Sequence, residues 1–336
     1  MCGRRVTHRA FCVGFPGLVV TVARVKEITA DLVTELLRAQ HPDLAHLPVS
    51  LGAVGWDNQL WRLGSELAVR LPWHADDTGG LLVKEHSVVP GLAGVLPLPV
   101  PVPQRLGRPS ELLDKHWIVT TWVDGTPADR APIGPSTTSA ATLASFLAAL
   151  HVAVPASGPA EALAGRDTRG LALSASQGGF DHFLDMIDGR GLLAAGVADA
   201  LRRVWNEAVA APEWTGPPLW LHADLHSANV LTRDGGLAAV VDFGDVRAGD
   251  PAVDVAAGWT LLPTVDDVHA FETRYLELAG AVAGDPGILT RARGWAALKA
   301  LICLEVGDNG DKGLPGGKPT WGPPGHAAIA RLLATV

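Results

Sequence analysis

Hydrophobic and polar residues alternate in two different ways along the chain, and the first part combines one helix with several strands. Between residues 27 and 41 apolar residues recur every three or four positions, which predicts an amphipathic helix capped by Thr29 or Asp31. Residues 49–73 hold three short apolar runs separated by turn residues at 55–58 and 64–65. This pattern predicts three short strands joined by tight turns.

The next fifty residues complete this first part of the chain. Residues 81–93 have a helical pattern that we expect to end at Pro90. Residues 96–107 alternate proline with apolar residues, so they are extended and cannot form a central strand, because proline lacks the N–H that a sheet needs. Residues 116–125 are a β-rich run that ends at a glycine. We therefore expect residues 27–124 to form a small N-terminal lobe.

From about residue 137 the helical pattern dominates. Residues 137–153 are rich in Ala and Leu, and five later segments have helical spacing before a last helix at 326–336. Two short apolar runs, which end near residues 221 and 241, read as strands followed by loops. Residues 308–325 are rich in Gly and Pro and predict a long loop. The sequence thus predicts an α+β protein with a larger helical lobe at 125–336 and a ligand cleft between the lobes.

Composition narrows the class of protein. The 336 residues are 48% hydrophobic and 18% charged, which is typical of a globular chain. The net charge of −8 argues against a nucleic-acid partner, and no run of about 20 apolar residues predicts a membrane span. Three cysteines without CxxC spacing indicate neither a disulfide framework nor a zinc ribbon, which suits the cytoplasm. Nothing in the sequence indicates an oligomeric state.

The first 26 residues have two interpretations. They begin with basic residues and continue into an apolar stretch, as a signal peptide does. However, Gly14, Pro16 and Gly17 interrupt the stretch and weaken any helix there. We expect a disordered leader, with a secretion signal as the alternative.

The strongest chemical signal is the sequence HADLHSAN followed by VVDFGDV. It places Asp224, Asn229 and Asp242 in two loops, each directly after an apolar strand. An Asp beside an acceptor hydroxyl can take its proton, and an Asn oxygen and a second carboxylate can hold Mg²⁺, which prefers oxygen ligands. The pattern His-x-Asp-x-x-x-x-Asn followed by Asp-Phe-Gly is typical of a phosphotransferase, in which the metal bridges phosphate oxygens.

Other interpretations of these loops remain open. The three polar residues could each serve a turn or a helix cap. His222, Asp224 and His226 alternate, and they could bind zinc if the stretch were a strand, as in a zinc hydrolase. His222 could equally be a structural histidine that holds the loop. Downstream, Asp250 precedes a proline and is expected to cap a helix, and Asp254 to bond the catalytic loop.

The N-terminal lobe should supply contacts to ATP or GTP. Arg70 stands in the strand SELAVRLPW, where a guanidinium could bind phosphate, and Glu85 on the following helix could pair with it. Lys84 is an alternative phosphate ligand. There is no GxGxxG loop, so the hairpin containing Gly55, Trp56 and Asn58 would cover the phosphates instead, unless it is an ordinary turn.

The strand that would link the lobes is the expected adenine site. Its backbone at Thr121 to Val123 could hydrogen-bond the base. On the acceptor side, Asp245 faces the metal loop and is a candidate substrate contact. Residues 308–325 could form either a lid over the acceptor or a simple connector.

Together these motifs resemble the aminoglycoside phosphotransferase family, which is related to choline and macrolide kinases. LHADLHSANVL is similar to the family's catalytic loop, VVDFGDVRAGDPAVDVA to its metal loop and GWDNQLWRLGSELAVRLP to its first hairpins, and the resemblance extends from about residue 27 to the end. It implies a bilobal protein-kinase-like fold, with Asp224 as catalytic base and Asn229 and Asp242 as magnesium ligands. Arg70 departs from the lysine usual in the family.

The resemblance also implies a substrate class. Phosphoryl transfer would go from ATP or GTP, with Mg²⁺, to a hydroxyl of an antibiotic. An aminoglycoside-like compound is the first expectation and a macrolide the alternative. In members that use polyamine drugs, acidic residues of the C-terminal helices hold the substrate, and the candidates here are Glu305, Asp308 and Asp311. A nucleotide-binding protein without turnover is the non-enzymatic alternative.

Overall fold

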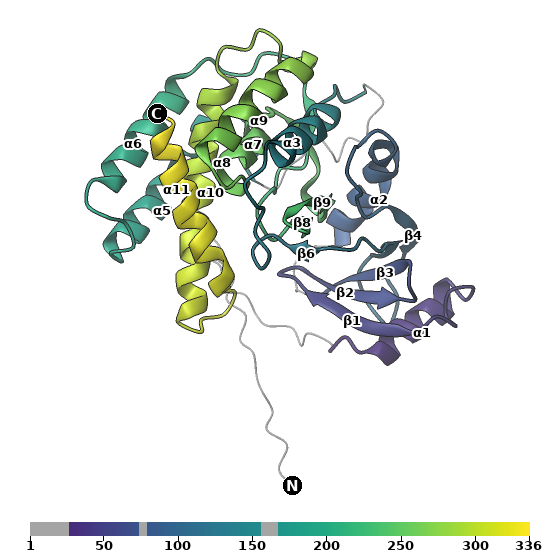
Figure 1. Cartoon of the computed structure of the whole chain (residues 1–336). Coiled ribbons are helices and arrows are strands. Elements are labelled where there is room, and N and C mark those ends of the chain that lie inside the picture. The colour runs from purple at the N-terminus through teal and green to yellow at the C-terminus, as the bar shows by residue number, and fades with distance from the viewer. Residues whose placement is uncertain (1–26, 74–78, 156–166) are drawn as a thin grey trace.

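The computed structural model describes residues 27–73, 79–155 and 167–336, so the predicted leader lies outside the described residues. The chain forms an N-terminal region built on an antiparallel sheet and a mainly helical C-terminal region, which confirms the α+β prediction (Figure 1). Helix α1, Ala30–Gln40, opens the N-terminal region, and the Thr29 hydroxyl caps it by accepting from the N–H of Leu32 at 3.2 Å. Thr29 is therefore the cap, and Asp31 lies in the first turn.

The N-terminal sheet has five antiparallel strands in the order β1-β2-β3-β5-β4. The three strands predicted at 49–73 are present, and the proline-rich segment supplies only an edge strand, as expected of a segment that lacks N–H groups. The strand bounds are Val49–Val54 for β1, Asn58–Leu63 for β2, Leu67–Pro72 for β3, Pro103–Gly107 for β4 and Trp117–Thr121 for β5.

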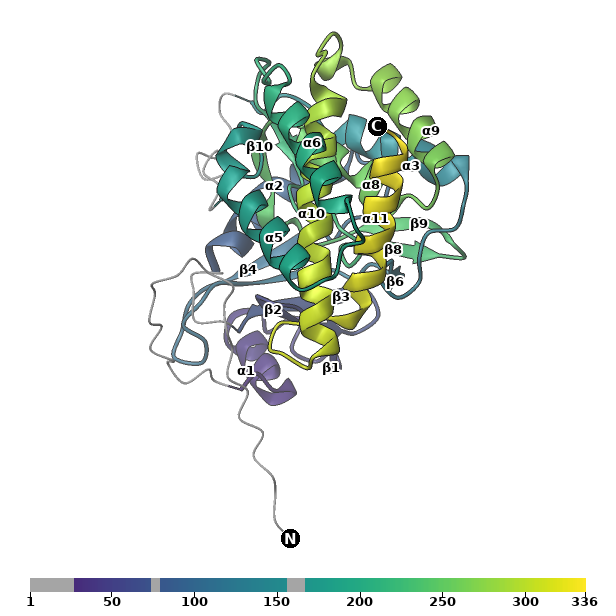
Figure 2. The same ribbon diagram turned by 90° about the vertical axis from the view of Figure 1, so that its left-hand side faces the viewer.

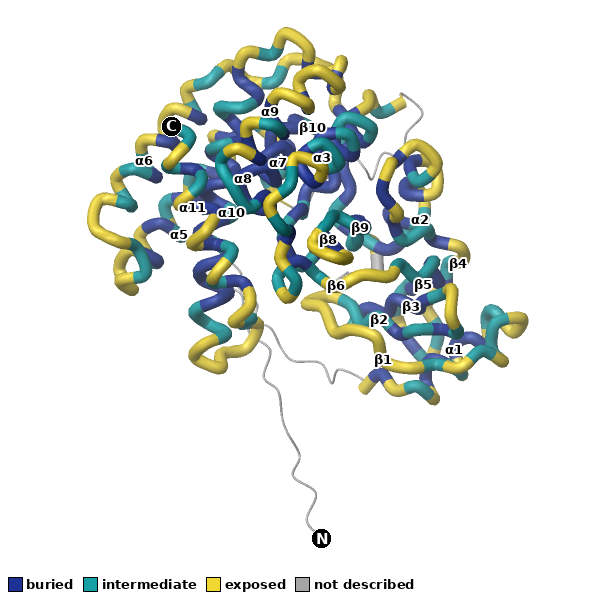
Figure 3. Tube along the Cα trace, viewed as in Figure 1, coloured by how far each residue is buried: buried dark blue, intermediate teal, exposed yellow. Residues whose placement is uncertain are grey.

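Two helices accompany this sheet, and their buried residues belong to two different hydrophobic cores. The apolar stripe of α1 packs against β2, β3 and β5 in a core that includes Leu36, Leu37 and Trp117. Figure 3 colours the buried positions of the chain dark blue. Helix α2, Gly79–Ala93, buries Val88 and Val89 in the main core of the C-terminal region instead. The helix continues past Pro90, so the predicted end at that residue was wrong. A proline removes one helical hydrogen bond, and packing of the flanking turns offsets this loss.

The C-terminal region is formed mainly by helices around one large core, with α10 and α11 side by side in both views (Figures 1 and 2). The α-helix bounds are Thr137–Leu150 for α3, Gln177–Gly189 for α5, Val197–Ala210 for α6, Ala252–Val255 for α7, Ala257–Leu261 for α8, Val265–Leu278 for α9, Ile288–Asp311 for α10 and Gly322–Ala334 for α11. Short 3-10 helices are Leu173–Ser176 (η1), Phe243–Asp245 (η2), Gly280–Val282 (η3) and Pro319–Trp321 (η4).

Two small sheets support the loops that carry the predicted chemistry. One has the order β6-β8-β9 and the other pairs β10 with β7. Their bounds are Thr126–Pro127 for β6, Leu219–Leu221 for β7, Val230–Arg233 for β8, Gly236–Val240 for β9 and Arg247–Gly249 for β10. Across the described ranges, no helix combines the length and apolar character needed to cross a membrane.

The predicted loop at 308–325 is much shorter in the structure. Helix α10 runs on to Asp311, and η4 begins at Pro319. Glycines of the predicted loop serve close packing instead: a Cβ on Gly310 would lie 2.3 Å from the nitrogen of Pro319, and one on Gly317 would lie 2.2 Å from the amide nitrogen of Gly310. Glycine is unfavourable in an isolated helix, but this tertiary contact overrides that preference.

Candidate active site

The loop after β7 is held in an unusual backbone conformation. Ala223 has a φ of 66°, a left-handed value that is rare for a residue with a Cβ. The buried carboxylate of Asp254 accepts from the N–H of His222 at 2.6 Å and from the N–H of Ala223 at 2.8 Å. The predicted bond between Asp254 and this loop is therefore present. It satisfies two buried donors and offsets the strain, which fixes the start of the loop.

His222 is a structural histidine and not a metal ligand. Its Nδ1 accepts from the N–H of Asp224 at 3.2 Å, so its Nε2 carries the proton and donates to the carbonyl of Val241 at 3.0 Å. The ring is fully buried, and burial lowers its pKa, so it stays neutral. Both ring nitrogens are thus in use. Among the described residues no group of three or more His, Cys, Asp or Glu is arranged to hold a metal ion.

Asp224 and Asn229 come together as predicted. The Asn229 amide nitrogen donates to the Asp224 carbonyl at 3.0 Å and to its Oδ2 at 3.2 Å. His226 Nε2 lies 3.4 Å from the same Oδ2. Arg169, which no sequence motif pointed to, donates from Nη1 to Asp224 Oδ1 at 2.7 Å. Both carboxylate oxygens of Asp224 therefore have polar partners.

Asp242 lies at the end of β9, next to the loop of Asn229. The N–H of Val241 donates to the Asn229 carbonyl at 2.9 Å, which places the two loops side by side. Asp242 has a φ of 66°, and its carboxylate is 47% exposed. Its Oδ1 accepts from Arg70 Nη2 at 2.6 Å. Asp224, Asn229 and Asp242 thus lie on two adjacent loops, as the sequence predicted.

Arg70 joins the N-terminal sheet to this loop. Its Nη1 donates to both carboxylate oxygens of Glu85 in α2, at 2.9 and 2.6 Å, so the predicted ion pair is present. Arg70 is 7% exposed and Glu85 is fully buried, which makes the pair much more than a surface contact. One guanidinium therefore links β3, α2 and the loop that contains Asp242.

The charge states of the two acids follow from these contacts. Burial raises the pKa of Asp224, but His226 and Arg169 outweigh it and hold the pKa well below its usual value. Partial desolvation by the surrounding protein opposes ionisation of Asp242, but Arg70 outweighs it and lowers the pKa of Asp242 overall. Both acids are ionised at neutral pH. Asp224 can accept a hydrogen bond from a hydroxyl, and Asp242 can bind a cation.

The donor set fits a magnesium ion. Because the Asn229 nitrogen is committed to Asp224, its amide oxygen is left for a metal, and no described residue hydrogen-bonds it. The Oδ2 of Asp242 likewise has no hydrogen bond among the described residues, since Arg70 binds Oδ1. Mg²⁺ is commonly held by one or two protein oxygens, with phosphates and water completing its shell. Two free oxygens on adjacent loops match that requirement.

Replacing Glu85 by alanine is expected to destabilise the fold strongly. The change would leave the buried Arg70 with a single carboxylate partner, and breaking a buried ion pair lowers the free energy of unfolding by about 3 kcal/mol. Glu277→Ala is the matched control, because Glu277 and its partner Arg274 are exposed. It should change stability by less than about 0.5 kcal/mol. Denaturant unfolding measures both, and equal effects would contradict the assignment.

The hairpin that was predicted to cover the phosphates makes contacts of its own within the protein. The N–H of Gly55 donates to the carbonyl of Asn58 at 2.8 Å within the turn, so it is not available to a phosphate. Trp56 stacks on Trp321 of η4 with ring centroids 5.7 Å apart, and Lys318 Nζ lies 5.7 Å from the centroid of the Trp56 ring. The tip of the hairpin therefore contacts the C-terminal region beside η4.

The backbone of the predicted adenine site already makes some hydrogen bonds within the protein. The N–H of Thr121 donates to the carbonyl of Val102 at 3.0 Å, and that of Trp122 to the carbonyl of Glu66 at 2.7 Å. Both N–H donors are therefore already used within the protein, and an adenine contact by the backbone at Thr121 to Val123 stays a prediction. Val123 lies beyond the end of β5, and no backbone hydrogen bond engages its N–H among the described residues.

The predicted acceptor-side acids are scattered, and two are neutralised. Asp245 Oδ1 lies 3.1 Å from Arg169 Nη2 and 3.0 Å from Arg247 Nη2. Asp308 is bound by Arg190 and Lys312 at 2.8 and 2.7 Å. All three candidates near the C-terminus lie on α10 and not in a loop: Glu305, which is buried, Asp308 and Asp311, which is exposed.

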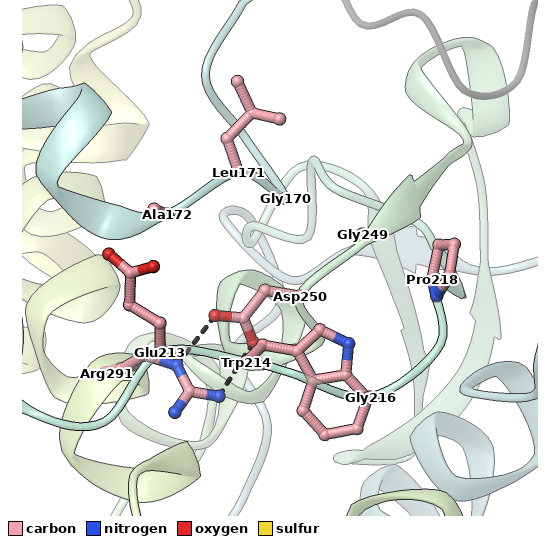
Figure 4. Close-up of a pocket in the computed structure, with 10 residues that line it drawn as sticks. All are labelled: Gly170, Leu171, Ala172, Glu213, Trp214, Gly216, Pro218, Gly249, Asp250 and Arg291. Atoms are coloured by element: carbon pink, nitrogen blue, oxygen red, sulfur yellow. Dashed lines mark hydrogen bonds and ion pairs between the residues drawn. The ribbon is translucent and has the colours of Figure 1, made fainter.

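A separate cavity of about 230 Å³ lies away from these residues (Figure 4). It is lined by Leu171, Trp214 and the ion pair of Asp250 with Arg291, whose closest N–O distance is 2.7 Å. Asp250 Oδ1 also accepts from the N–H of Ala252 at 3.0 Å, as expected of a residue that caps the following helix. Asp224, Asn229 and Asp242 do not line this cavity.

Solved structures share this fold across most of the chain. The GDP and kanamycin complex of APH(2")-IIia is 19% identical, with 90% of this chain and 98% of that one covered and a TM-score of 0.57. The macrolide 2'-phosphotransferase MphH from Brachybacterium faecium is 21% identical, with coverage of 90% and 98% and a TM-score of 0.55. The kinase-like fold is therefore confirmed.

The sequence of the chain establishes the family to which it belongs. No curated protein sequence matches the chain. The profile of the phosphotransferase enzyme family matches residues 49–301, which include Arg70, Asp224, Asn229 and Asp242. The predicted resemblance is thereby confirmed, and the chain belongs to the phosphotransferase enzyme family.

Proposed function

We propose that this phosphotransferase transfers the γ-phosphate of ATP or GTP, with Mg²⁺, to a hydroxyl of an antibiotic-type small molecule. The observation that carries the proposal is the meeting of Asp224, Asn229 and Asp242 at adjacent loop ends, with Arg70 beside them. Structural neighbours bind GDP and kanamycin or are named macrolide 2'-phosphotransferases, which supports an antibiotic acceptor.

In this proposal each residue of the site has one task. Asp224 orients the acceptor hydroxyl and takes its proton as the oxygen attacks phosphorus. Asn229 and Asp242 would hold Mg²⁺, which when bound neutralises charge on the phosphates. Arg70 anchors Asp242. Its guanidinium would also be a second positive charge, beside Mg²⁺, that could bind a phosphate oxygen. Most of the rate acceleration would come from positioning and electrostatics, because phosphoryl transfer needs little covalent chemistry from the protein.

The two candidate acceptor classes, aminoglycosides and macrolides, differ in the number of positive charges that they carry. An aminoglycoside carries several ammonium groups, which unpaired carboxylates would bind. Asp245 and Asp308 already have guanidinium or ammonium partners, which favours an acceptor with fewer charges, such as a macrolide. Glu305 and Asp311 have no such ion pair among the described residues, so they could bind the ammonium groups of an aminoglycoside.

The experiment that tests the function is a nucleotide-consumption screen. Purified protein with Mg²⁺ and ATP, and separately GTP, is mixed with aminoglycosides, macrolides, cyclic peptide antibiotics and amino alcohols. We expect one acceptor class to stimulate nucleotide use and to gain one phosphate by mass spectrometry. Nucleotide binding without phosphorylation of any acceptor would favour a binding protein without turnover.

A further inference from the structure

Arg169 contacts the proposed base from a segment outside the two loops. Its Nη1 donates to Asp224 Oδ1 at 2.7 Å, although the two residues are 55 positions apart in the chain. We propose that Arg169 is a positioning residue that fixes the Asp224 carboxylate in the orientation required for phosphoryl transfer. The proposal rests on the proposed function, since it assigns Arg169 a role through the base.

The carboxylate of Asp224 is held from both of its oxygens. Arg169 binds Oδ1, whereas the Asn229 nitrogen and His226 Nε2 lie 3.2 and 3.4 Å from Oδ2. The last torsion of an Asp side chain is broad, so an unrestrained carboxylate turns readily about its Cβ–Cγ bond. Contacts on both oxygens restrict that rotation. A fixed plane lets the base meet the acceptor hydroxyl without reorganisation.

Arg169 can act as a fixed support because its own guanidinium is restrained. Its Nε and Nη2 bind the two oxygens of Asp167, with the shortest distance 2.6 Å, and Nη2 lies 3.1 Å from Asp245. Arg247, which is 2% exposed, binds Asp167 at 2.8 Å and Asp245 at 3.0 Å. Two guanidinium groups and three carboxylates therefore form one network that ends at the base.

The backbone next to Arg169 is fixed by glycine packing. Gly170 has a φ of 84°, and a Cβ there would lie 2.8 Å from Leu221 Cδ1. A Cβ on Gly249 would lie 2.2 Å from the Gly170 carbonyl, which accepts from the N–H of Asp250 at 2.8 Å. Gly170 and Gly249 also border the cavity of Figure 4. Their close approach holds Arg169 against β7 and β10, near the loop of Asp224.

The alternative is that the ion pair of Arg169 with Asp224 only stabilises the fold. A double-mutant cycle distinguishes this role from positioning of the Asp224 carboxylate. Full-length protein is prepared as wild type, Arg169→Gln, Arg169→Lys, Asp224→Ala and the Asp224→Ala, Arg169→Gln double variant. The probe is radiolabelled MgATP with water as acceptor, followed as phosphate release, which requires no identified antibiotic. Melting temperature and nucleotide affinity are recorded for every variant, so that loss of folding is detected.

We expect Arg169→Gln to lower kcat about thirtyfold, with the KM for MgATP unchanged within about twofold, because a misplaced group costs up to about 10² in rate. Arg169→Lys keeps one charged donor and should lose less than about fivefold. In the Asp224→Ala background, Arg169→Gln should lower kcat by less than about a further twofold, because Arg169 acts through the carboxylate that this background lacks. Arg274→Gln, which removes an exposed charge on α9, should match the wild type.

Two results would overturn the proposal, and they differ in what else they affect. Equal loss of rate from Arg169→Gln in both backgrounds would show that Arg169 acts independently of Asp224, and the proposed function would stand. Wild-type phosphate release by Asp224→Ala would remove both the role of Arg169 and the role of the base.

Discussion

Asp224→Ala is expected to reduce phosphoryl transfer by about 10²–10⁴ in kcat, the usual contribution of a general base. The carboxylate is ionised at neutral pH and is oriented by Arg169 and Asn229, so its removal takes away the positioned base. Nucleotide affinity should remain nearly unchanged, because the phosphate and metal contacts are assigned to other residues. Steady-state kinetics with the acceptor found in the screen, together with calorimetry of MgATP binding, measure the two quantities separately.

A matched variant controls for damage to the fold at this loop. Asp224→Asn keeps the shape of the side chain and one oxygen acceptor but loses the base, so it should be nearly as inactive as the alanine variant. Melting temperatures close to the wild type are expected for both, because the backbone of this loop is held by Asp254 and not by Asp224. Substantial turnover by either variant would contradict the assignment of Asp224 as base.

Asp242→Ala should weaken binding of the magnesium–nucleotide complex by about 100-fold or more. Outer-shell partners of a metal are typically worth 10–100-fold in affinity, and a direct carboxylate ligand is expected to be worth at least as much. The signature is specific: nucleotide affinity in the wild type should fall when magnesium is chelated, whereas in Asp242→Ala it should respond little to magnesium. Calorimetry with and without the metal measures this difference.

The same variant also removes one partner of Arg70, so stability must be followed alongside binding. Arg70 keeps both hydrogen bonds to Glu85, so the loss of stability should be smaller than for Glu85→Ala. If Asp242→Ala binds nucleotide with the same dependence on magnesium as the wild type, Asp242 is not a metal ligand.

The sequence could predict those parts of the site that are local or that follow a strand. Asp224 and Asn229 share one loop, and Asp242 follows the neighbouring strand, so strand pairing brings them together. The pair of Arg70 and Glu85 connects a strand to the next helix along the chain, which is again a short path. In each case alternation of apolar and polar residues located the element, and the motif located the residue.

Other features depend on contacts between distant segments and had no local signal. Arg169 reaches Asp224 only because glycine packing brings its segment against β10. Helix α10 extends through a glycine-rich stretch because those glycines pack against the chain at 317–322. The N–H groups of Thr121 and Trp122 likewise donate to carbonyls of segments distant in the chain. Propensity is a weak guide wherever tertiary packing decides.

The central claim is that Asn229 and Asp242 hold one magnesium ion on a nucleotide that faces Asp224. A crystal structure of the protein with Mg²⁺ and a non-hydrolysable ATP analogue tests it most directly. We expect a metal ion at about 2.1 Å from the Asn229 amide oxygen and from an Asp242 carboxylate oxygen, with phosphate oxygens and water as its other ligands. A nucleotide bound elsewhere, or a metal that contacts neither side chain, would contradict it.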